Sequence, residues 1–312
     1  MSTSGRSMST PGRLRPPALE STPGEPDAAF DARLTRLETV LTRIGRVVVA
    51  FSGGADSAFL ACVANRALGP AQALCVTAVS PSLATGEELH CRALAAEWEL
   101  RWQAVETAEM TDPRYVANGA DRCARCKDAL MAALAPVAAA ESATVVLGVN
   151  TDDLGDFRPG QAAAAAAGAR FPLVEAGLTK SDVRALSRRL GLRTWNRPAG
   201  ACLASRLPYG TPVTAPTLRA VDAAESGLRA LGLREFRVRH HGAIARVEVA
   251  ERELALVWSR RAEVVAAVKA AGYEIVSLDL EGFRSGSLNR LLRSTPPASG
   301  SATVRAGDLP AR

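Results

Sequence analysis

The sequence of 312 residues lacks a long hydrophobic run and shows no secretion signal. Its longest run of small apolar residues, 162–167, is too short and too weakly hydrophobic to cross a membrane. The N-terminus has no apolar core of a signal peptide, so we expect a cytoplasmic protein. In that compartment six cysteines are expected to serve as thiols, ligands or catalysts rather than as a disulfide framework.

Lysine is almost absent, because only three of the 38 basic residues are lysines, namely Lys127, Lys180 and Lys269. Arginine is the default surface cation, so a lysine here is more often than usual required as a compact point charge. The net charge of +6 is modest and lacks the clustered basic stripe that a nucleic-acid surface needs. We therefore expect a small anionic molecule as the partner, and neither nucleic acid nor membrane.

The most informative stretch is 47–65, in which a short apolar run is broken by Ser-Gly-Gly and followed by an apolar-periodic helix. Glycines at such a turn let backbone N–H groups approach an anion, and the following helix offers its positive dipole end. The Gly-Lys-Ser/Thr ending of kinase-type phosphate loops is absent. The alternative is a small-residue turn that binds nothing. The candidate nucleotide-binding residues are Ser52, Gly53, Gly54, Asp56 and Ser57.

Alternating strand and helix patterns predict an α/β fold, with a Rossmann-like domain built on a parallel sheet that has helices on both faces. Beyond residue 214 a helix, a hairpin with period-two alternation, a second helix and a strand predict a smaller α+β domain. We expect an ATP-binding domain at 29–200 and a substrate-binding domain at 201–292. Residues 1–28 and 293–312 are expected to be disordered tails.

Cys123 and Cys126 form a CxxC pair that brings two sulfurs within reach of one metal ion or cluster. The neighbouring cations Arg122, Arg125 and Lys127 are expected to favour the thiolate form of both cysteines. A redox disulfide and half of a zinc site stay open as alternatives, although no second CxxC completes a four-cysteine zinc site. The pair alone does not decide between them.

Two acidic residues follow the predicted strand 144–149, and a lysine opens a later helix. Asp153 at the carboxyl end of a strand suits a Mg²⁺ or ribose contact, and the alternative is a capped turn. Thr179 is expected to cap a helix that begins near Lys180. Lys180 is a candidate triphosphate contact, because a solvated lysine in a first helical turn opposes the helix dipole. Arg158 lies in a loop between these two segments. A contact with an anionic ligand and a purely structural role are equally good interpretations of it.

The segment 195–210 places Cys202 among prolines, glycines and small residues, with Ser205 and Arg206 following within one turn. An exposed thiol beside a cation favours a reactive thiolate or a ligand over an inert core cysteine. The remaining cysteines lie in apolar helix or strand patterns, which predicts packing roles for Cys62, Cys75 and Cys91.

A pair of arginines stands out in the predicted strand 236–240. Because side chains alternate along a strand, Arg237 and Arg239 project to the same face. Together they offer two cations to a phosphate or carboxylate. The alternative is a solvated basic face.

The ordered set of motifs resembles one protein family. Residues 52–57 are similar to the loop of the PP-loop ATP pyrophosphatases, which bind the pyrophosphate of ATP and transfer AMP to a substrate oxygen. From about residue 33 to 289 the chain resembles the LarE branch, ATP-dependent sulfur transferases that act on the pyridinium precursor of the nickel-pincer cofactor of lactate racemase. The motifs that carry the resemblance are SGGADS, RCARCK, GVNTDD, DFRPG, PAGACLASRLPYG, RVRHHG with ARVEV, and LDLEGFRSGSLN.

The resemblance implies both a reaction and roles for particular residues. ATP with Mg²⁺ would activate each carboxylate of pyridinium-3,5-biscarboxylate mononucleotide as an adenylate, since a carboxylate has no good leaving group of its own. A sulfur nucleophile would then displace AMP, once per carboxylate. Besides the loop residues, the implied ATP contacts are Asp153, Lys127 and Lys180, and the implied substrate contacts are Ser205, Arg206, Glu225, Arg237 and Arg239.

The source of the sulfur depends on three cysteines. In the simpler members of the family one cysteine, here Cys202, gives up its own sulfur. A CxxC with one distant cysteine resembles the three-cysteine members, in which Cys123, Cys126 and Cys202 would hold a 4Fe-4S cluster that carries external sulfide. We expect the cluster form, as a homo-oligomer. A sacrificial Cys202, a PP-loop tRNA thiolase and a non-catalytic nucleotide or iron-sulfur carrier are the alternatives.

Overall fold

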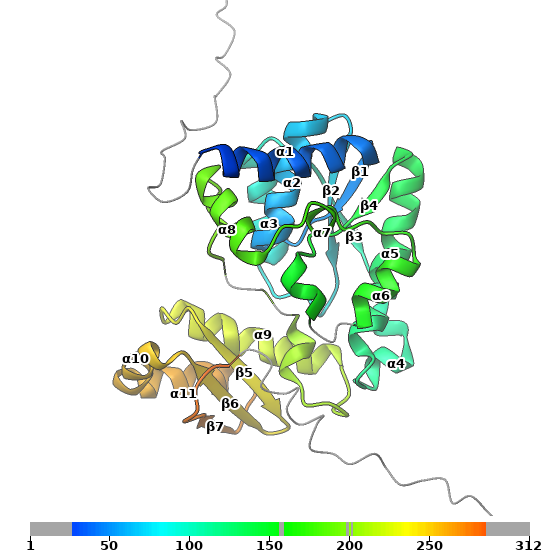
Figure 1. The fold of residues 1–312 in the computed structure, drawn as a ribbon. Helices are drawn as coiled ribbons and strands as arrows, with labels where there is room; N and C mark the ends of the chain where they lie inside the picture. The colour runs from blue at the N-terminus through cyan, green and yellow to red at the C-terminus, as the bar shows by residue number, and fades with distance from the viewer. Residues whose placement is uncertain (1–26, 156–158, 198–199, 201, 285–312) are drawn as a thin grey trace, which may run out of the picture.

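The computed structural model describes residues 27–155, 159–197, 200 and 202–284, which form two sheets with their helices (Figure 1). The predicted tails lie outside these ranges, except that residues 27 and 28 already belong to the first helix. Arg158 also lies outside the described residues. The domain boundary that we expect at residue 200 stays a prediction.

The first sheet is parallel throughout, with the strand order β3-β2-β1-β4. Its central strand is built from valine and alanine, which suits a strand that is covered by helices on both faces. This architecture confirms the predicted α/β fold with a parallel sheet. The strands are β1 (Val47–Ala50), β2 (Ala73–Val79), β3 (Arg101–Glu106) and β4 (Thr144–Val146).

Helices and short 3-10 turns connect these strands, and none of the helices within the described ranges is long and apolar enough to cross a membrane. The helices are α1 (Asp27–Ile44), α2 (Ala55–Leu68), α3 (Glu87–Glu97), α4 (Pro113–Val116), α5 (Arg122–Glu141), α6 (Pro159–Ala166), α7 (Pro172–Glu175) and α8 (Lys180–Arg189). The 3-10 turns are η1 (Glu109–Thr111), η2 (Thr151–Gly155) and η3 (Leu203–Arg206).

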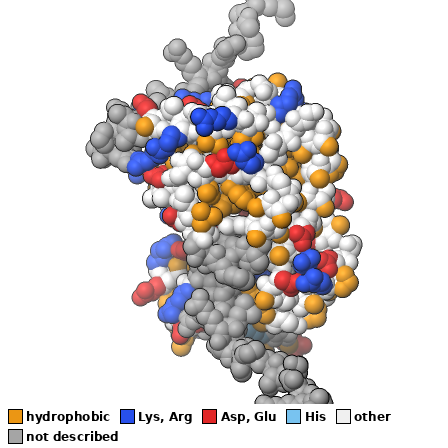
Figure 2. Space-filling model, turned by 45° about the vertical axis from the view of Figure 1, so that its right-hand side comes forward, with side chains coloured by type: hydrophobic (Ala, Val, Ile, Leu, Met, Phe, Trp, Pro, Cys, Tyr) orange, Lys and Arg blue, Asp and Glu red, His pale blue; other side chains and the backbone are white. Residues whose placement is uncertain are grey.

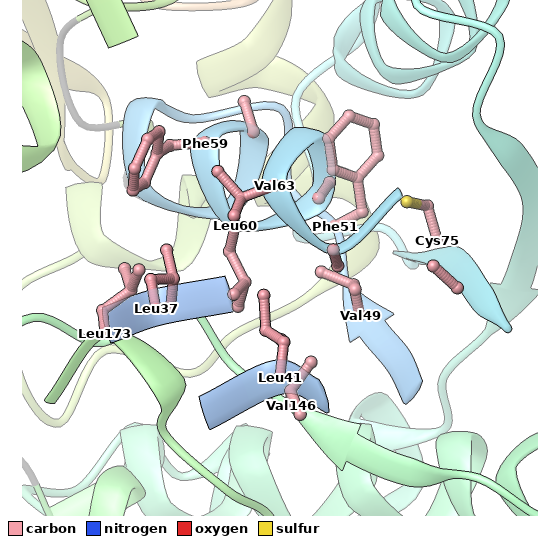
Figure 3. Packing of buried hydrophobic residues seen from close by; sticks show 14 of the residues in the cluster. Leu37, Leu41, Val49, Phe51, Phe59, Leu60, Val63, Cys75, Val146 and Leu173 are labelled. Carbon is pink, nitrogen blue, oxygen red and sulfur yellow. The ribbon is translucent and has the colours of Figure 1, made fainter. Parts of the chain in front are cut away.

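Strand β1 sends alternate side chains to opposite faces of the sheet, and each face has its own core. Val49 packs with α1, α2, α3, α7 and α8, in the cluster shown in Figure 3. Val48 packs on the other face, where α5 and α6 cover the sheet (Figure 1). The carboxyl end of β1 is therefore fixed from both sides.

The second sheet has the order β5-β6-β7, in which β5 and β6 form an antiparallel hairpin and β7 runs parallel to β6. Helices α9 and α11 pack on it through a separate apolar core. This arrangement matches the predicted α+β pattern beyond residue 214. The elements are β5 (Phe236–His241), β6 (Ile244–Val249), β7 (Ile275–Leu278), α9 (Ala215–Ala230), η4 (Glu251–Glu253), α10 (Leu254–Ser259) and α11 (Arg261–Ala270).

A fourth core, which we call the junction core, joins residues from before and after residue 200. Tyr115 of α4 packs there with η3 and with the first half of α9. The backbone N–H of Leu203 donates to the carbonyl oxygen of Ser82 at 2.8 Å. Cys126 and Cys202, 76 positions apart in the chain, both pack against this core. The fold thereby brings the CxxC pair to the distant cysteine.

Candidate active site

Residues 52–57 run from the tight turn after β1 into the first turn of α2. Gly53 has a φ of +66°, a left-handed conformation that glycine adopts without strain. The Ser57 hydroxyl accepts from the backbone N–H of Ser52 at 3.2 Å and donates to the carbonyl of Gly54 at 3.3 Å. The loop thus lies at the N-terminus of α2, where backbone N–H groups and the helix dipole favour an anion.

The loop also lies at the point where the strand order of the sheet reverses, between β1 and β4. In open parallel sheets, ligands bind in the crevice outside the carboxyl ends of the strands at this point. Gly148, just after β4, makes the close approach possible, because a Cβ at this position would lie 2.8 Å from the backbone nitrogen of Ser57. We infer that glycine is required there.

We predict that Gly148→Ala weakens ATP binding and lowers the free energy of unfolding by about 1–3 kcal/mol. The added methyl group would meet the backbone of Asp56 and Ser57, so the start of α2 has to move. Isothermal titration with ATP and urea denaturation measure the two effects. An unchanged affinity for ATP would show that the contact does not hold the loop in place.

Polar side chains from two other segments converge on Asp56 of this loop. Its carboxylate forms an ion pair with the ammonium group of Lys180 and accepts from the amide of Asn150 at 3.3 Å. The backbone N–H of Lys180 donates to Asp152, and that of Asn150 donates to Asp153. The structure therefore brings Asp153 and Lys180 to the loop, although they follow different elements in the sequence.

Helix α8 begins at Lys180 as predicted. The Thr179 hydroxyl accepts from the backbone N–H of Asp182, and the Asp182 carboxylate accepts from that of Thr179, which completes a capping box. This cap fixes the first turn and so directs Lys180 at Asp56.

Lys127 lies away from this loop: it packs against Gly160 of α6 and is close to Cys126. The structure thus places it on the cysteine side of the site.

His90 of α3 is a neighbour of the loop that the sequence does not indicate. Its ring packs against Gly53, where a Cβ would lie 2.9 Å from the histidine Cδ2. Burial lowers the pKa of the imidazole, and Arg197 lowers it further. The Nε2 atom is buried and has no hydrogen-bond partner among the described residues. A single histidine in a helix pattern carries no sequence signal for such a position.

The three predicted sulfur ligands lie at the start of α5 and just before η3. Cys123 is exposed, whereas Cys126 and Cys202 are half-buried. Arg122 joins the two segments, because its guanidinium donates to the carbonyl of Ala204 at 2.8 Å and lies 4.0 Å from the sulfur of Cys123. Cys202 and Cys123 both lie within electrostatic reach of that guanidinium.

The expectation that nearby cations favour the thiolate is wrong for Cys126. Burial, together with the negative charge of a Cys202 thiolate, raises the pKa of its thiol to about 12. Lys127 lowers the pKa, but burial has the larger effect. The sequence shows the cations but not the depth of the thiol in the junction core.

The candidate metal-binding atoms near Arg122 and the junction core are the sulfur atoms of three cysteines. Within the described ranges, no group of three or more His, Cys, Asp or Glu side chains is arranged to hold a single metal ion. A four-iron cluster differs from a single ion, because each cysteine binds a different iron. Cys123 and Cys202 lie near the Arg122 guanidinium, and Cys126 and Cys202 pack against the junction core, so the three thiols of the predicted cluster lie in one region of the fold.

The other three cysteines are core residues, as predicted. Cys75 and Cys91 are buried, and Cys62 packs against the same cluster. Burial raises the pKa of Cys62 to about 11 and that of Cys75 to about 12, and it also raises the pKa of Cys91. Their sulfurs are therefore protonated at neutral pH.

We predict that an alkylating reagent labels iron-free native protein in a fixed order. Cys123 should react first because it is exposed, and Cys126 later because its thiol is half-buried with a raised pKa. Cys75 should react only after unfolding in urea. Peptide mass spectrometry at successive times gives the order. Labelling of Cys75 in native protein as fast as that of Cys123 would contradict this assignment.

The predicted substrate residues form one buried charged cluster at η3, α9 and β5. Arg206 makes a bidentate ion pair with Glu225, with both N–O distances at 2.8 Å. Its remaining amino group donates to the carbonyl of Cys202 and to the hydroxyl of Ser205, both at 3.1 Å. The Glu225 carboxylate also accepts from the backbone N–H of Val238. The pair therefore ties the Cys202 segment to strand β5.

Arg239 and Arg237 extend this cluster along β5. Arg239 is buried, donates to the carbonyl of Ser205 at 2.9 Å and pairs with Glu248 at 2.8 Å. Arg237 is half-buried, and its guanidinium carbon lies 4.8 Å from the ring centre of Phe283. Burial, with smaller contributions from Arg206 and Arg239, lowers the pKa of Arg237 to about 10. A bound anion would stabilise the charged form of Arg237.

Comparison with known proteins points to one family. The chain is 38% identical over 269 residues to the pyridinium-3,5-bisthiocarboxylic acid mononucleotide synthase of Lactiplantibacillus plantarum, and the match covers 85% of this chain and 96% of that protein. The chain belongs to the LarE family. It is also 41% identical over 267 residues to an uncharacterised protein of Synechocystis sp., covering 84% of this chain and 99% of that protein.

A family model described as NAD synthase matches residues 36–127 of this LarE chain. That range runs from α1 through the loop at 52–57 to the CxxC pair. The match therefore falls on the nucleotide-binding half of the fold. The chain is an ATP-dependent enzyme of the PP-loop superfamily, and the matched range includes residues 52–57, which resemble the PP loop and are called by that name below.

Proposed function

We propose that this LarE protein converts both carboxylates of pyridinium-3,5-biscarboxylate mononucleotide into thiocarboxylates, with ATP as the activating reagent. One observation carries the proposal: the guanidinium of Arg206 bonds to the carbonyl of Cys202 and lies beside Arg237. The arginines that would bind an anionic substrate are thereby hydrogen-bonded to the segment that carries Cys202, the candidate sulfur-carrying residue. The name of the L. plantarum relative supports the choice of substrate.

The PP loop would bind the pyrophosphate part of ATP. Its backbone N–H groups and the start of α2 favour the negative charge of the leaving pyrophosphate. Lys180 and Asp56, held together by their ion pair, lie at the same end of the sheet. The Mg²⁺ that accompanies ATP would take its remaining ligands from the carboxylates of Asp56 and Asp153. Transfer of AMP turns a carboxylate oxygen into part of a good leaving group.

The arginines of β5 and η3 would hold the substrate nucleotide. Arg237 is the least buried of the three, so we assign it the contact with a substrate phosphate or carboxylate. Arg206 and Arg239 are bound to Glu225 and Glu248, and both also donate to the Cys202–Ser205 segment. We therefore propose that Arg206 and Arg239 position the Cys202–Ser205 segment. Ser205 and Glu225 would line the substrate site beside it.

We predict that Arg237→Gln raises the KM for the pyridinium nucleotide about tenfold to a hundredfold, because a charge-assisted bond to an anion is lost. Arg234→Gln, an exposed arginine at the turn before β5, is the matched control and should leave the KM unchanged. Steady-state release of pyrophosphate measures both. Equal KM values for the two variants would remove Arg237 from the substrate site.

Sulfur would be supplied at Cys123, Cys126 and Cys202. As ligands of a 4Fe-4S cluster, the three thiolates would leave one iron without a protein ligand, and the cluster would then supply a binding place for external sulfide. Arg122 fixes the distance between the segments that carry the thiols, and the junction core limits access of water to Cys126 and Cys202. In the alternative, Cys202 gives up its own sulfur and each protein molecule acts once.

This function places the protein in the synthesis of the nickel-pincer cofactor, upstream of lactate racemase. We propose a cytoplasmic homo-oligomer that takes sulfide or another small sulfur donor as its second partner. The use of six free cysteines without disulfide partners supports a reducing compartment.

Substrate-dependent exchange between ATP and labelled pyrophosphate tests the activation step. We expect exchange that requires the pyridinium biscarboxylate nucleotide. Anaerobic purification followed by iron and sulfide analysis tests the cluster, and iron-free protein that loses one sulfur per turnover would favour the sacrificial form. Exchange that no pyridinium nucleotide stimulates would contradict the proposed substrate.

A tRNA thiolase would need a broad basic surface for RNA. On the face drawn in Figure 2, the described Lys and Arg side chains are scattered among Asp and Glu side chains. This distribution favours a small substrate. Thiolation of bulk tRNA, without activity on the pyridinium nucleotide, would overturn that choice.

A further inference from the structure

After β7 the chain turns back to the end of β6, and an aromatic side chain there reaches the arginines of the substrate site. The backbone N–H of Phe283 donates to the carbonyl of Val249 at 2.8 Å. The ring of Phe283 lies over the guanidinium of Arg237, whose central carbon is 4.8 Å from the ring centre. The reaction described above gives this ring no role.

A tight turn at 279–282 sets the position of the ring. The backbone N–H of Gly282 donates to the carbonyl of Asp279, and the φ of Gly282 is +71°, in the left-handed region. A Cβ at Gly282 would lie only 2.9 Å from the carbonyl oxygen of Val249. Both the conformation and the space therefore require glycine. A larger residue at this position would shift Phe283 relative to Arg237.

The three arginines of the cluster are held in two different ways. Arg206 and Arg239 each form an ion pair with a buried carboxylate at 2.8 Å. Arg237 donates to the carbonyl of Phe236 at 2.7 Å, and the face of its guanidinium lies against Phe283. A stacked ring occupies the face of a planar guanidinium and not the N–H groups at its edge. Stacking can therefore orient Arg237 without using the donors that an anion needs.

The ring also shields one side of Arg237 from water. Arg237 is half-buried, and burial is the main reason that its pKa falls to about 10. The guanidinium therefore stays charged at neutral pH although it has lost part of its hydration. A charge in such surroundings binds an anion more strongly than a fully solvated charge does.

We infer that Phe283 is a positioning residue for the substrate, because its ring holds the guanidinium of Arg237 in the orientation that binds a phosphate or carboxylate of the pyridinium nucleotide. The inference rests on the proposed function, which supplies that anion. Phe283 acts through Arg237 and takes part in no covalent step. Its loss should therefore weaken substrate binding without slowing the chemical steps that follow.

Steady-state release of pyrophosphate by the full-length protein tests this role. Phe283→Leu removes the ring but keeps an apolar side chain, and Gly282→Ala keeps the ring but shifts it. In each variant the KM for the pyridinium nucleotide should rise about threefold to tenfold. The kcat and the KM for ATP should stay within about twofold, which also shows that the variants fold. Phe283→Tyr, which keeps the aromatic face, should have the KM of the unaltered protein.

A second stacked pair provides the matched control. The guanidinium carbon of Arg189 lies 4.0 Å from the ring centre of Phe30, in the core of the first sheet and outside both candidate sites. Phe30→Leu should lower the stability of the protein but leave the KM for the pyridinium nucleotide unchanged. The effect of Phe283→Leu should also largely disappear when Arg237 is already glutamine. An unchanged KM in Phe283→Leu, or effects of the two substitutions that add in full, would overturn the inference.

Binding of inorganic phosphate separates this inference from the proposed function. Isothermal titration measures the phosphate binding that Arg237→Gln abolishes, and Phe283→Leu should weaken that binding about threefold to tenfold. This result, in a protein whose exchange no pyridinium nucleotide stimulates, would support the role of Phe283 and refute the proposed substrate. A phosphate affinity that Phe283→Leu does not change would overturn the inference and leave the proposed function standing.

Discussion

Replacing Cys202 with alanine is expected to stop sulfur transfer to the pyridinium nucleotide, by about a thousandfold or more. The residue is required in both versions of the chemistry, as a cluster ligand and as a sacrificial donor. Activation of the substrate should continue, because the PP loop and the arginine cluster use only the backbone carbonyl of Cys202. Pyrophosphate exchange should therefore stay within about twofold of the unaltered protein.

The measurement compares thiocarboxylate formation with pyrophosphate exchange in the same preparation. Cys62→Ala is the matched control, since Cys62 packs at the edge of the core and lies in no candidate site. It should keep both activities. Loss of exchange together with sulfur transfer in Cys202→Ala would mean that the residue supports activation or folding. Full sulfur transfer by the variant would remove Cys202 from the site.

The Glu225→Gln substitution is expected to lower the free energy of unfolding by about 3–5 kcal/mol. It leaves the guanidinium of Arg206 buried without its bidentate partner, and only 4% of Arg206 is exposed. The same carboxylate accepts from the backbone of Val238, so β5 and η3 lose a shared anchor. Urea denaturation measures the change.

An exposed ion pair provides the control for this effect. Arg193 and Glu97 form a bridge whose side chains are 47% and 44% exposed, so Glu97→Gln should cost less than about 1 kcal/mol. A double variant that replaces Arg206 and Glu225 with apolar residues of similar volume should recover much of the stability lost by Glu225→Gln. A loss below 1 kcal/mol in Glu225→Gln would show that the pair is not desolvated in solution.

The parts of the site that sequence predicts well are local. The PP loop lies in a strand–turn–helix segment of about twenty residues. Its two glycines and Ser57 therefore predict the turn from neighbouring positions alone. The Thr179 cap and the shared face of Arg237 and Arg239 likewise follow from short-range periodicity. The order of the sheet then places Lys180 at Asp56, a contact between residues 124 positions apart that no local pattern in the sequence predicts.

The parts that sequence reasoning missed depend on burial and on distant contacts. Glu109 looks like an ordinary loop residue in the sequence, and only the structure shows that its Oε2 atom is buried without a hydrogen bond among the described residues. The pKa of Cys126 was mispredicted for the same reason, because its cationic neighbours are visible in the sequence and its burial is not. Glu248, which pairs with Arg239, comes from the opposite strand of the hairpin.

Isotope-labelled sulfide tests the central claim most directly. The full-length protein, loaded with iron under anaerobic conditions, is given ATP, Mg²⁺, pyridinium-3,5-biscarboxylate mononucleotide and sulfide that carries a heavy sulfur isotope. Mass spectrometry then examines both the product and the peptide that contains Cys202. We predict a bisthiocarboxylate that carries the heavy isotope, formed over several turnovers with Cys202 intact. An unlabelled product with Cys202 converted to dehydroalanine, or no thiocarboxylate at all, would contradict the account.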